Sequence, residues 1–138
     1  MTAEDAVTIR RWEARDRDQV QSLLRLLSED AVVVGTAAPT YVAATGERVV
    51  GMVTLCTFET LTGPKAFLDH LVVAPPWRRR GIARALVRHA IGVAEAAGAS
   101  RVDLTASESK QAARALYESL GFRRRGTGSF RLDLAGGP

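Results

Sequence analysis

One stretch near the middle of the chain constrains the fold more than any other. The apolar segment AFLDHLVV, residues 66–73, is followed by PPWRRR and Gly81, and an apolar helical pattern begins at Ile82. A strand, a short basic loop and a helix in direct succession leave the first helical N–H groups unpaired, at the positive end of the helix dipole. This arrangement predicts an anion-binding site where the helix begins.

The residues of the loop fit that interpretation. Arg78, Arg79 and Arg80 supply charge and forked N–H donors, and Gly81 has no side chain to keep an anion from the backbone. A solvated run of surface charge is the alternative, but the strand before the loop and the apolar helix after it favour a binding site. The loop lacks the glycine patterns of dinucleotide and nucleoside-triphosphate sites, so the predicted anion is neither NAD nor ATP.

Hydrophobic periodicity on both sides of the loop predicts a mixed α/β fold. We expect a first strand, a helix that Asp16 caps, three strands joined by tight turns, and then helix, strand, helix and one or two closing strands. Residues 29–39 fit either a helical extension or a short strand. In chain order, the expected elements cover residues 7–13, 16–28, 40–45, 49–58, 66–73, 82–97, 101–106, 107–120 and 122–134.

Length and composition narrow the class of protein. The chain has 138 residues, which suits a single domain over residues 1–138. It has no apolar run of about 20 residues and no N-terminal signal-peptide pattern, so we expect no membrane segment and a cytoplasmic location. The lone Cys56 excludes an internal disulfide and a cysteine-rich metal site. We expect it to be a small buried hydrophobe rather than a nucleophile, and we expect no metal.

The charge balance favours a small anionic partner over nucleic acid. The net charge is +4, a modest excess that attracts anions in general. Aromatic residues make up only 6% of the chain, too few for a base-stacking platform. Nucleic acid is therefore an unlikely partner. A second basic cluster, Arg123 to Arg125, fits edge-strand solubility, with an acidic substrate or a cofactor phosphate as the alternative.

Two motifs together resemble a known family. LVVAPPWRRRGIARALV, residues 71–87, looks like the acyl-CoA-binding motif of the GNAT superfamily of N-acetyltransferases, Arg/Gln-x-x-Gly-x-Gly/Ala after a strand ending in Val-x-Pro. AARALYESLGF, residues 112–122, resembles its second signature, at the expected separation. The resemblance implies a mixed, mostly antiparallel sheet of six to seven strands with helices on both faces.

The resemblance also implies the cosubstrate, acetyl-CoA, and the residues that hold it. Its pantetheine arm would bond to the backbone of Leu71, Val72 and Val73, and its pyrophosphate would lie on the loop amides. Lys110 stands where many relatives carry Asn, and it either reaches a CoA phosphate or is solvated. The loop residues implied in binding are Arg78, Arg79, Arg80, Gly81, Ile82, Ala83 and Arg84.

For the chemistry, the resemblance implies that Tyr117 is the acid that protonates the leaving thiolate; a core tyrosine is the alternative. Strand alternation places Asp69 with Leu71 and Val73 on one face and His70 on the other. Relatives often carry a base on the face of the motif's final valine, which selects Asp69 over His70. The alternatives are that Asp69 positions substrate or makes a structural hydrogen bond, and that Glu59 in the adjacent turn, or ordered water, takes the proton instead.

We therefore expect an N-acetyltransferase that moves an acetyl group to a primary amine by direct attack in a ternary complex. A non-catalytic acyl-CoA sensor is the alternative. The acceptor, a small molecule or a protein amino group, is not readable from the sequence. The connection over residues 29–39 is short for the family, so a second copy of the chain is one way to complete the acceptor site, and this would give a homodimer.

Overall fold

A computed structural model of the chain describes residues 6–35 and 39–135. It divides into two compact units, residues 1–105 and residues 106–138, which are described separately. The first unit holds the sheet, two of the helices and the basic loop. The second unit holds the last helix and the chain that follows it.

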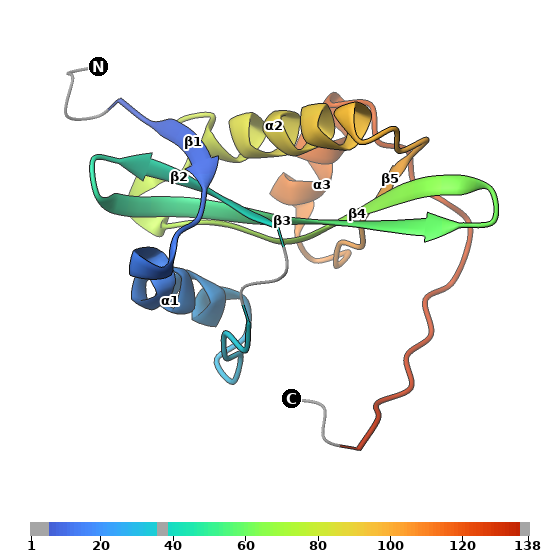
Figure 1. Cartoon of the computed structure of the whole chain (residues 1–138), viewed down its shortest axis with the longest axis horizontal. Coiled ribbons are helices and arrows are strands. Elements are labelled where there is room, and N and C mark those ends of the chain that lie inside the picture. Colours follow the sequence, from blue (N-terminus) through green and yellow to red (C-terminus); the bar gives the residue numbers. More distant parts are fainter. Residues whose placement is uncertain (1–5, 36–38, 136–138) are drawn as a thin grey trace. The chain divides into compact units, whose positions relative to one another are not determined.

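The first unit is built on a five-stranded mixed sheet with the strands in chain order (Figure 1). The three pairings among the first four strands are antiparallel, and the fourth strand pairs with the fifth in parallel. Turns at Gly46-Glu47 and Leu61-Thr62 join the second strand to the third and the third to the fourth, which confirms the tight turns expected between these strands. The strands are β1 (Thr8–Arg11), β2 (Thr40–Thr45), β3 (Arg48–Thr60), β4 (Gly63–Val73) and β5 (Val102–Asp103).

Two helices cover opposite faces of this sheet, as expected (Figure 1). Helix α1 (Arg17–Leu27) places apolar residues three and four positions apart, and it buries them against β2, β3 and β4. Helix α2 (Ile82–Ala96) approaches β3 from the other side, where a Cβ built on Gly51 would lie 3.2 Å from the Leu86 side chain. The core on the α1 side consists of Val20, Leu23, Leu24, Val42, Val49, Met52 and Val72.

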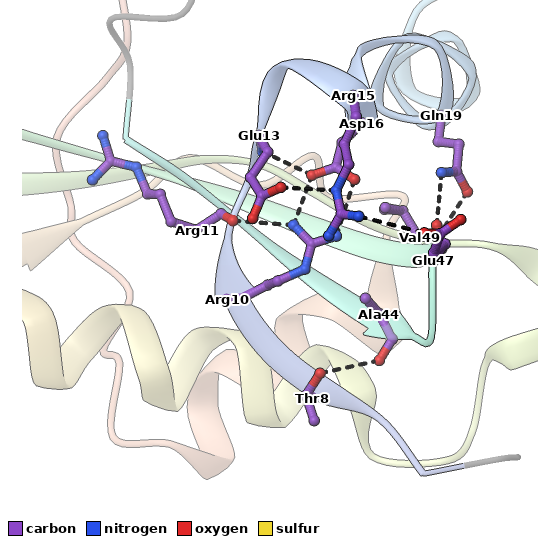
Figure 2. A network of polar contacts seen from close by, with 10 residues as sticks. All are labelled: Thr8, Arg10, Arg11, Glu13, Arg15, Asp16, Gln19, Ala44, Glu47 and Val49. Carbon is purple, nitrogen blue, oxygen red and sulfur yellow. Dashed lines mark hydrogen bonds and ion pairs between the residues drawn. The ribbon is translucent and has the colours of Figure 1, made fainter.

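Asp16 lies before α1, but it does not cap the helix as the sequence predicted (Figure 2). Its carboxylate accepts two hydrogen bonds from the Arg10 guanidinium, at 2.7 and 3.0 Å, and one from the backbone N–H of Glu13 at 2.8 Å. Asp16 is only 1% exposed, so its charge needs a partner within the protein. The Arg10 guanidinium on β1 is a stronger partner than the helix N–H groups, because it is charged. The interaction ties α1 to the sheet edge.

Gln19 attaches α1 to the first hairpin (Figure 2). Its amide nitrogen donates to the Glu47 carbonyl at 3.0 Å, and its amide oxygen accepts from the Val49 N–H at 2.8 Å. Gln21 binds the backbone of the next connection in the same two-ended way, at Ala31 and Val33. Residues 28–35 are therefore held to α1 without forming the helical extension or strand that the sequence left open; residues 36–38 of that connection lie outside the described residues.

The closing strands expected over residues 122–134 do not form, so the sheet has five strands within residues 6–35 and 39–135 rather than the six or seven expected. Phe130, Leu132 and Leu134 alternate as in a strand, yet all three are exposed. Alternation produces a strand only where another strand pairs with it. In the second unit, α3 (Gln111–Ser119) begins after Lys110, so it is shorter than the helix expected over residues 107–120.

Candidate functional site

Strands β4 and β5 separate soon after they meet. They pair only at Ala66 with Val102 and at Phe67 with Asp103. Among the described residues of the first unit, the rest of β4 has a strand neighbour only on its β3 side. Backbone polar groups along such an edge can pair with an extended ligand. The three residues expected to hold the pantetheine arm, Leu71 to Val73, lie on this stretch.

The basic loop connects the end of that edge to the start of α2. Gly81 is the N-cap, and its φ of 81° lies in the left-handed region that favours glycine. Apart from its neighbours along the chain, nothing lies within 4 Å of the place where its Cβ would be, so the backbone here is open to approach. The first helical bond runs from the Ala85 N–H to the Gly81 carbonyl, so the N–H groups of Ile82 and Ala83 precede it.

The arginines of the loop are partly held by the protein itself. The Nε of Arg78 donates to the Val73 carbonyl at 2.9 Å, which attaches the loop to the end of β4. The Arg80 guanidinium lies 4.7 Å from the ring centre of the buried Trp77. Arg79 adopts a left-handed φ of 65° and is exposed. The loop therefore carries ordered positive charge, and Trp77 is a positioning residue that the sequence reasoning did not single out.

A bulge in β4 corrects the predicted faces of its residues. Met52 and Thr54, two apart on β3, share a face and pair with Val72 and Asp69 of β4. Asp69 and Val72 therefore point the same way although they are three residues apart, which requires one extra residue between them. Val73 pairs with Gly51 and lies on the α2 face. The prediction that Asp69 shares a face with Val73 was wrong.

The bulge gathers a polar cluster on the α1 face of the sheet. His70 adopts a left-handed φ of 52°, and its backbone N–H donates to Oδ1 of Asp69 at 2.8 Å. Its Nδ1 lies 3.4 Å from Oγ1 of Thr54, which is 3.0 Å from Oγ1 of Thr40. Its Nε2 lies 3.6 Å from Oδ2 of Asp69. His70 is thus on the same side as Asp69, not on the opposite face as alternation predicted.

The sequence gave no signal for the two threonines of this cluster, because threonine is common in strands. Both are buried, at 8% exposure for Thr40 and 4% for Thr54, whereas about half of the Asp69 and His70 side chains is exposed. The cluster therefore has a buried end made of hydroxyls and an open end made of a carboxylate and an imidazole.

The structure also bears on two other candidate residues, Glu59 and Cys56. Glu59 lies five residues along β3 from Thr54, about 16 Å at the rise of a strand, so the structure does not bring it to Asp69. Cys56 is half-buried, and burial together with the charge of Asp69 raises the pKa of its thiol. A raised pKa keeps the thiol protonated, which fits the expectation that Cys56 is not a nucleophile.

The second unit carries the other two candidate residues. Tyr117 is half-buried on α3, and its ring meets Phe122 edge-on with 5.8 Å between the ring centres. Burial raises the pKa of the Tyr117 phenol, so the group keeps its proton. Lys110 is exposed at the start of α3, where its N–H donates to the Ser107 carbonyl. Arg124, from the second basic cluster, pairs with Glu108.

The described residues hold neither a metal cluster nor a helix that could cross a membrane. Within residues 6–35 and 39–135, no group of three or more His, Cys, Asp or Glu side chains is placed to hold a metal ion. None of the helices in those ranges is both long and apolar enough to cross a membrane.

Comparisons with known proteins agree with this architecture. The family model described as "Acetyltransferase (GNAT) family" matches residues 4–122. Human N-acetyltransferase 8 is 40% identical over 92 residues, which cover 65% of this chain but only 40% of that protein.

Solved structures show the same fold. A putative acetyltransferase from Agrobacterium tumefaciens superposes with a TM-score of 0.80 at 27% identity, over 92% of this chain and 99% of its own. An aminoglycoside N-acetyltransferase in complex with CoA superposes with a TM-score of 0.78 at 15% identity, over 93% of this chain and 95% of its own. The match to the family model spans the strand edge, the basic loop and α3, and the chain belongs to the GNAT acetyltransferase family.

Proposed function

We propose that this protein transfers an acetyl group from acetyl-CoA to a primary amine by direct attack within a ternary complex. The observation that carries the proposal is the open edge of β4 leading directly into the loop that ends at Gly81. An extended chain with an anionic group at one end fits such a path, and acetyl-CoA is a molecule of that shape. The CoA complex of the aminoglycoside acetyltransferase supports this choice.

The residues divide into two binding regions. The backbone of Leu71, Val72 and Val73 would pair with the pantetheine arm along the edge of β4. The pyrophosphate would be held at the helix start by N–H groups and positive charge, with Lys110 as a further contact to a CoA phosphate. The residues proposed for the helix start are Arg78, Arg79, Arg80, Gly81, Ile82, Ala83 and Arg84.

Acetyl transfer to an amine needs a proton acceptor and a proton donor. The proton acceptor must take a proton from the amine and so free its lone pair. We assign this step to Asp69, with His70 beside it as the alternative. The donor must neutralise the departing thiolate, and we assign this step to the phenol of Tyr117. Its raised pKa supports this role because the phenol still carries a proton at neutral pH.

Calorimetric titration of acetyl-CoA into the purified protein tests the proposal. Gly81→Glu places a negative side chain where the pyrophosphate would lie, so we expect it to remove micromolar binding. Gly92→Glu is the matched control, because Gly92 is exposed on the same helix with open space around it. This control should bind as the wild type does.

The outcomes separate the possible functions. Binding that Gly81→Glu loses, followed by acetylation in a screen of amines, would support the enzyme. Binding with no turnover of any amine would instead indicate an acyl-CoA sensor. If the wild type does not bind acetyl-CoA, both readings fail, and the arginine clusters should then be tested against nucleic acid.

A further inference from the structure

Lys65 is a buried cation near the start of β4, at the end where β5 pairs with it. It is only 5% exposed, and lysine is rarely buried so deeply unless a carboxylate accompanies it. In the described part of the chain, no carboxylate forms an ion pair with Lys65. Its ammonium group instead donates to Oγ of Ser100 at 2.9 Å and to the Thr62 carbonyl at 3.3 Å. Both acceptors are neutral, so stability alone does not explain why this charge is buried.

The two acceptors belong to different segments of the first unit. Thr62 lies in the turn between β3 and β4, and Ser100 lies in the connection from α2 to β5. A backbone hydrogen bond runs beside the side-chain contact, from the Ser100 N–H to the Pro64 carbonyl at 3.1 Å. Lys65 therefore attaches the chain that enters β5 to the first residues of β4.

The register of β5 needs such an attachment because β5 is very short. The strand pairs with β4 at two positions, and two pairings specify a register weakly. A shift by one residue would exchange the faces of Val102 and Asp103, and further pairing would close the edge of β4. The ammonium group can only donate, so the direction of its bond to Ser100 is fixed. Fixing a register is the best-attested use of a buried polar group.

We infer that Lys65 is a positioning residue that holds β5 to the first residues of β4 and thereby keeps the rest of the β4 edge open for acetyl-CoA. The inference rests on the proposed function, because it concerns the edge assigned there to the cosubstrate. β5 last pairs with β4 at Phe67, two residues or about 7 Å before Asp69, to which the proton transfer is assigned. The attachment therefore borders the stretch where the acetyl end of the cosubstrate would lie.

Hydrogen exchange of ¹⁵N-labelled protein, followed by NMR, tests the attachment without any ligand. Lys65→Met keeps an unbranched apolar side chain and removes the ammonium group. We expect the Ser100 amide, which bonds to the Pro64 carbonyl, to exchange about tenfold faster or more in this variant. The Leu55 amide bonds to the Pro39 carbonyl at 2.9 Å, on the β2 side of β3, and should exchange at the wild-type rate.

Calorimetric titration of acetyl-CoA shows whether the attachment serves the binding edge. We expect Lys65→Met to weaken binding by about tenfold, since an edge that is not preorganised pairs less well with a ligand. Its melting temperature should equal or exceed that of the wild type, because an apolar side chain of similar size in place of a buried charge is often neutral or stabilising. A loss of affinity without a loss of stability distinguishes positioning from a merely structural role.

Variants of Ser100 supply the matched controls. Ser100→Ala removes the acceptor and should weaken binding as Lys65→Met does, whereas Ser100→Thr keeps a hydroxyl at an exposed position and should bind as the wild type does. In the Lys65→Met background, Ser100→Ala should have no further effect, because both changes break the same contact. Arg101→Met removes an exposed cation one residue away, in an ion pair with Asp103, and should leave binding unchanged.

The outcomes separate this inference from the proposed function. Wild-type affinity in Lys65→Met, unchanged exchange at Ser100, or a loss of affinity that accompanies a lower melting temperature would each overturn the inference. If Lys65→Met does not fold, the contrast between Ser100→Ala and Ser100→Thr decides in its place. Failure of the wild type to bind acetyl-CoA would instead overturn the proposed function and leave the exchange result intact.

Discussion

At the scale of single residues, charge and burial decide what each side chain does. Asp16 looked like a helix cap in the sequence, but the structure uses it as the buried partner of Arg10. The hydrogen bond from Arg10, assisted by the one from the Glu13 backbone, holds the pKa of the Asp16 carboxyl below its usual range. Its ionised form therefore stabilises the folded state.

We expect Asp16→Asn to lower the free energy of unfolding by about 2–4 kcal/mol at neutral pH, because the guanidinium of Arg10 loses a charged partner. The contribution of Asp16 is fully present above its unfolded pKa of about 3.9. It is lost as the pH falls from there through the lower folded pKa. Urea unfolding at several pH values measures both effects.

The variant should accordingly show a weaker loss of stability below about pH 4 than the wild type does. Glu47→Gln serves as the control, because the side chain of Glu47 is 90% exposed in its ion pair with Arg15. It should unfold as the wild type does. Equal acid sensitivity of wild type and Asp16→Asn would contradict the assignment.

Tyr117 is a second residue whose role a single substitution tests. We expect Tyr117→Phe to lower kcat by about tenfold to a hundredfold and to leave acetyl-CoA affinity unchanged, since only the hydroxyl is lost. Because burial raises the pKa of the phenol, its absorbance titration should move above the ordinary value of about 10. Wild-type turnover by Tyr117→Phe would remove Tyr117 from the mechanism.

At the scale of elements, the contact between α2 and β3 keeps the helix start beside the strand edge. Gly51 makes this contact close: a Cβ there would lie 3.2 Å from the Val72 carbonyl oxygen and 3.3 Å from the Ile82 side chain. The carbonyl belongs to the backbone of β4 and cannot move away as a flexible side chain would. The contact therefore fixes both the β4 edge and the first residue of the helix.

We expect Gly51→Ala to lower the free energy of unfolding by about 1–3 kcal/mol through overpacking. Gly92→Ala is the control within α2, at an exposed helical position with open space. This change should instead stabilise by about 0.5–1 kcal/mol, because alanine favours a helix more than glycine does. Denaturant unfolding of both variants measures the contrast, and equal effects of the two would refute the packing argument.

At the scale of the whole molecule, ligand binding and stability are linked. A ligand that binds only the folded state at about one hundred times its Kd stabilises that state by about 2.7 kcal/mol. We therefore expect acetyl-CoA at that excess to raise the melting temperature of the wild type by several degrees. Differential scanning fluorimetry should show no such rise for Gly81→Glu. An equal rise in both proteins would place the ligand away from the loop.

The sequence alone determined the order of the elements from β1 to α3, the position of the basic loop and the family resemblance. These depend on local signals: apolar periodicity for α1 and α2, tight turns for the hairpins, and a glycine followed by an apolar helix at residue 81. The structure confirmed these local expectations because each depends on residues within a few positions of one another.

Only the tertiary structure decided which side chains meet. One extra residue in β4 reverses the face of everything beyond it, so alternation placed His70 away from Asp69 although the two lie together. Thr40 and Thr54 meet because two strands pair in a given register, and Asp16 meets Arg10 across the turn that joins β1 to α1. Segment 122–134 alternates like a strand yet forms none, since strand formation requires a partner that periodicity does not specify.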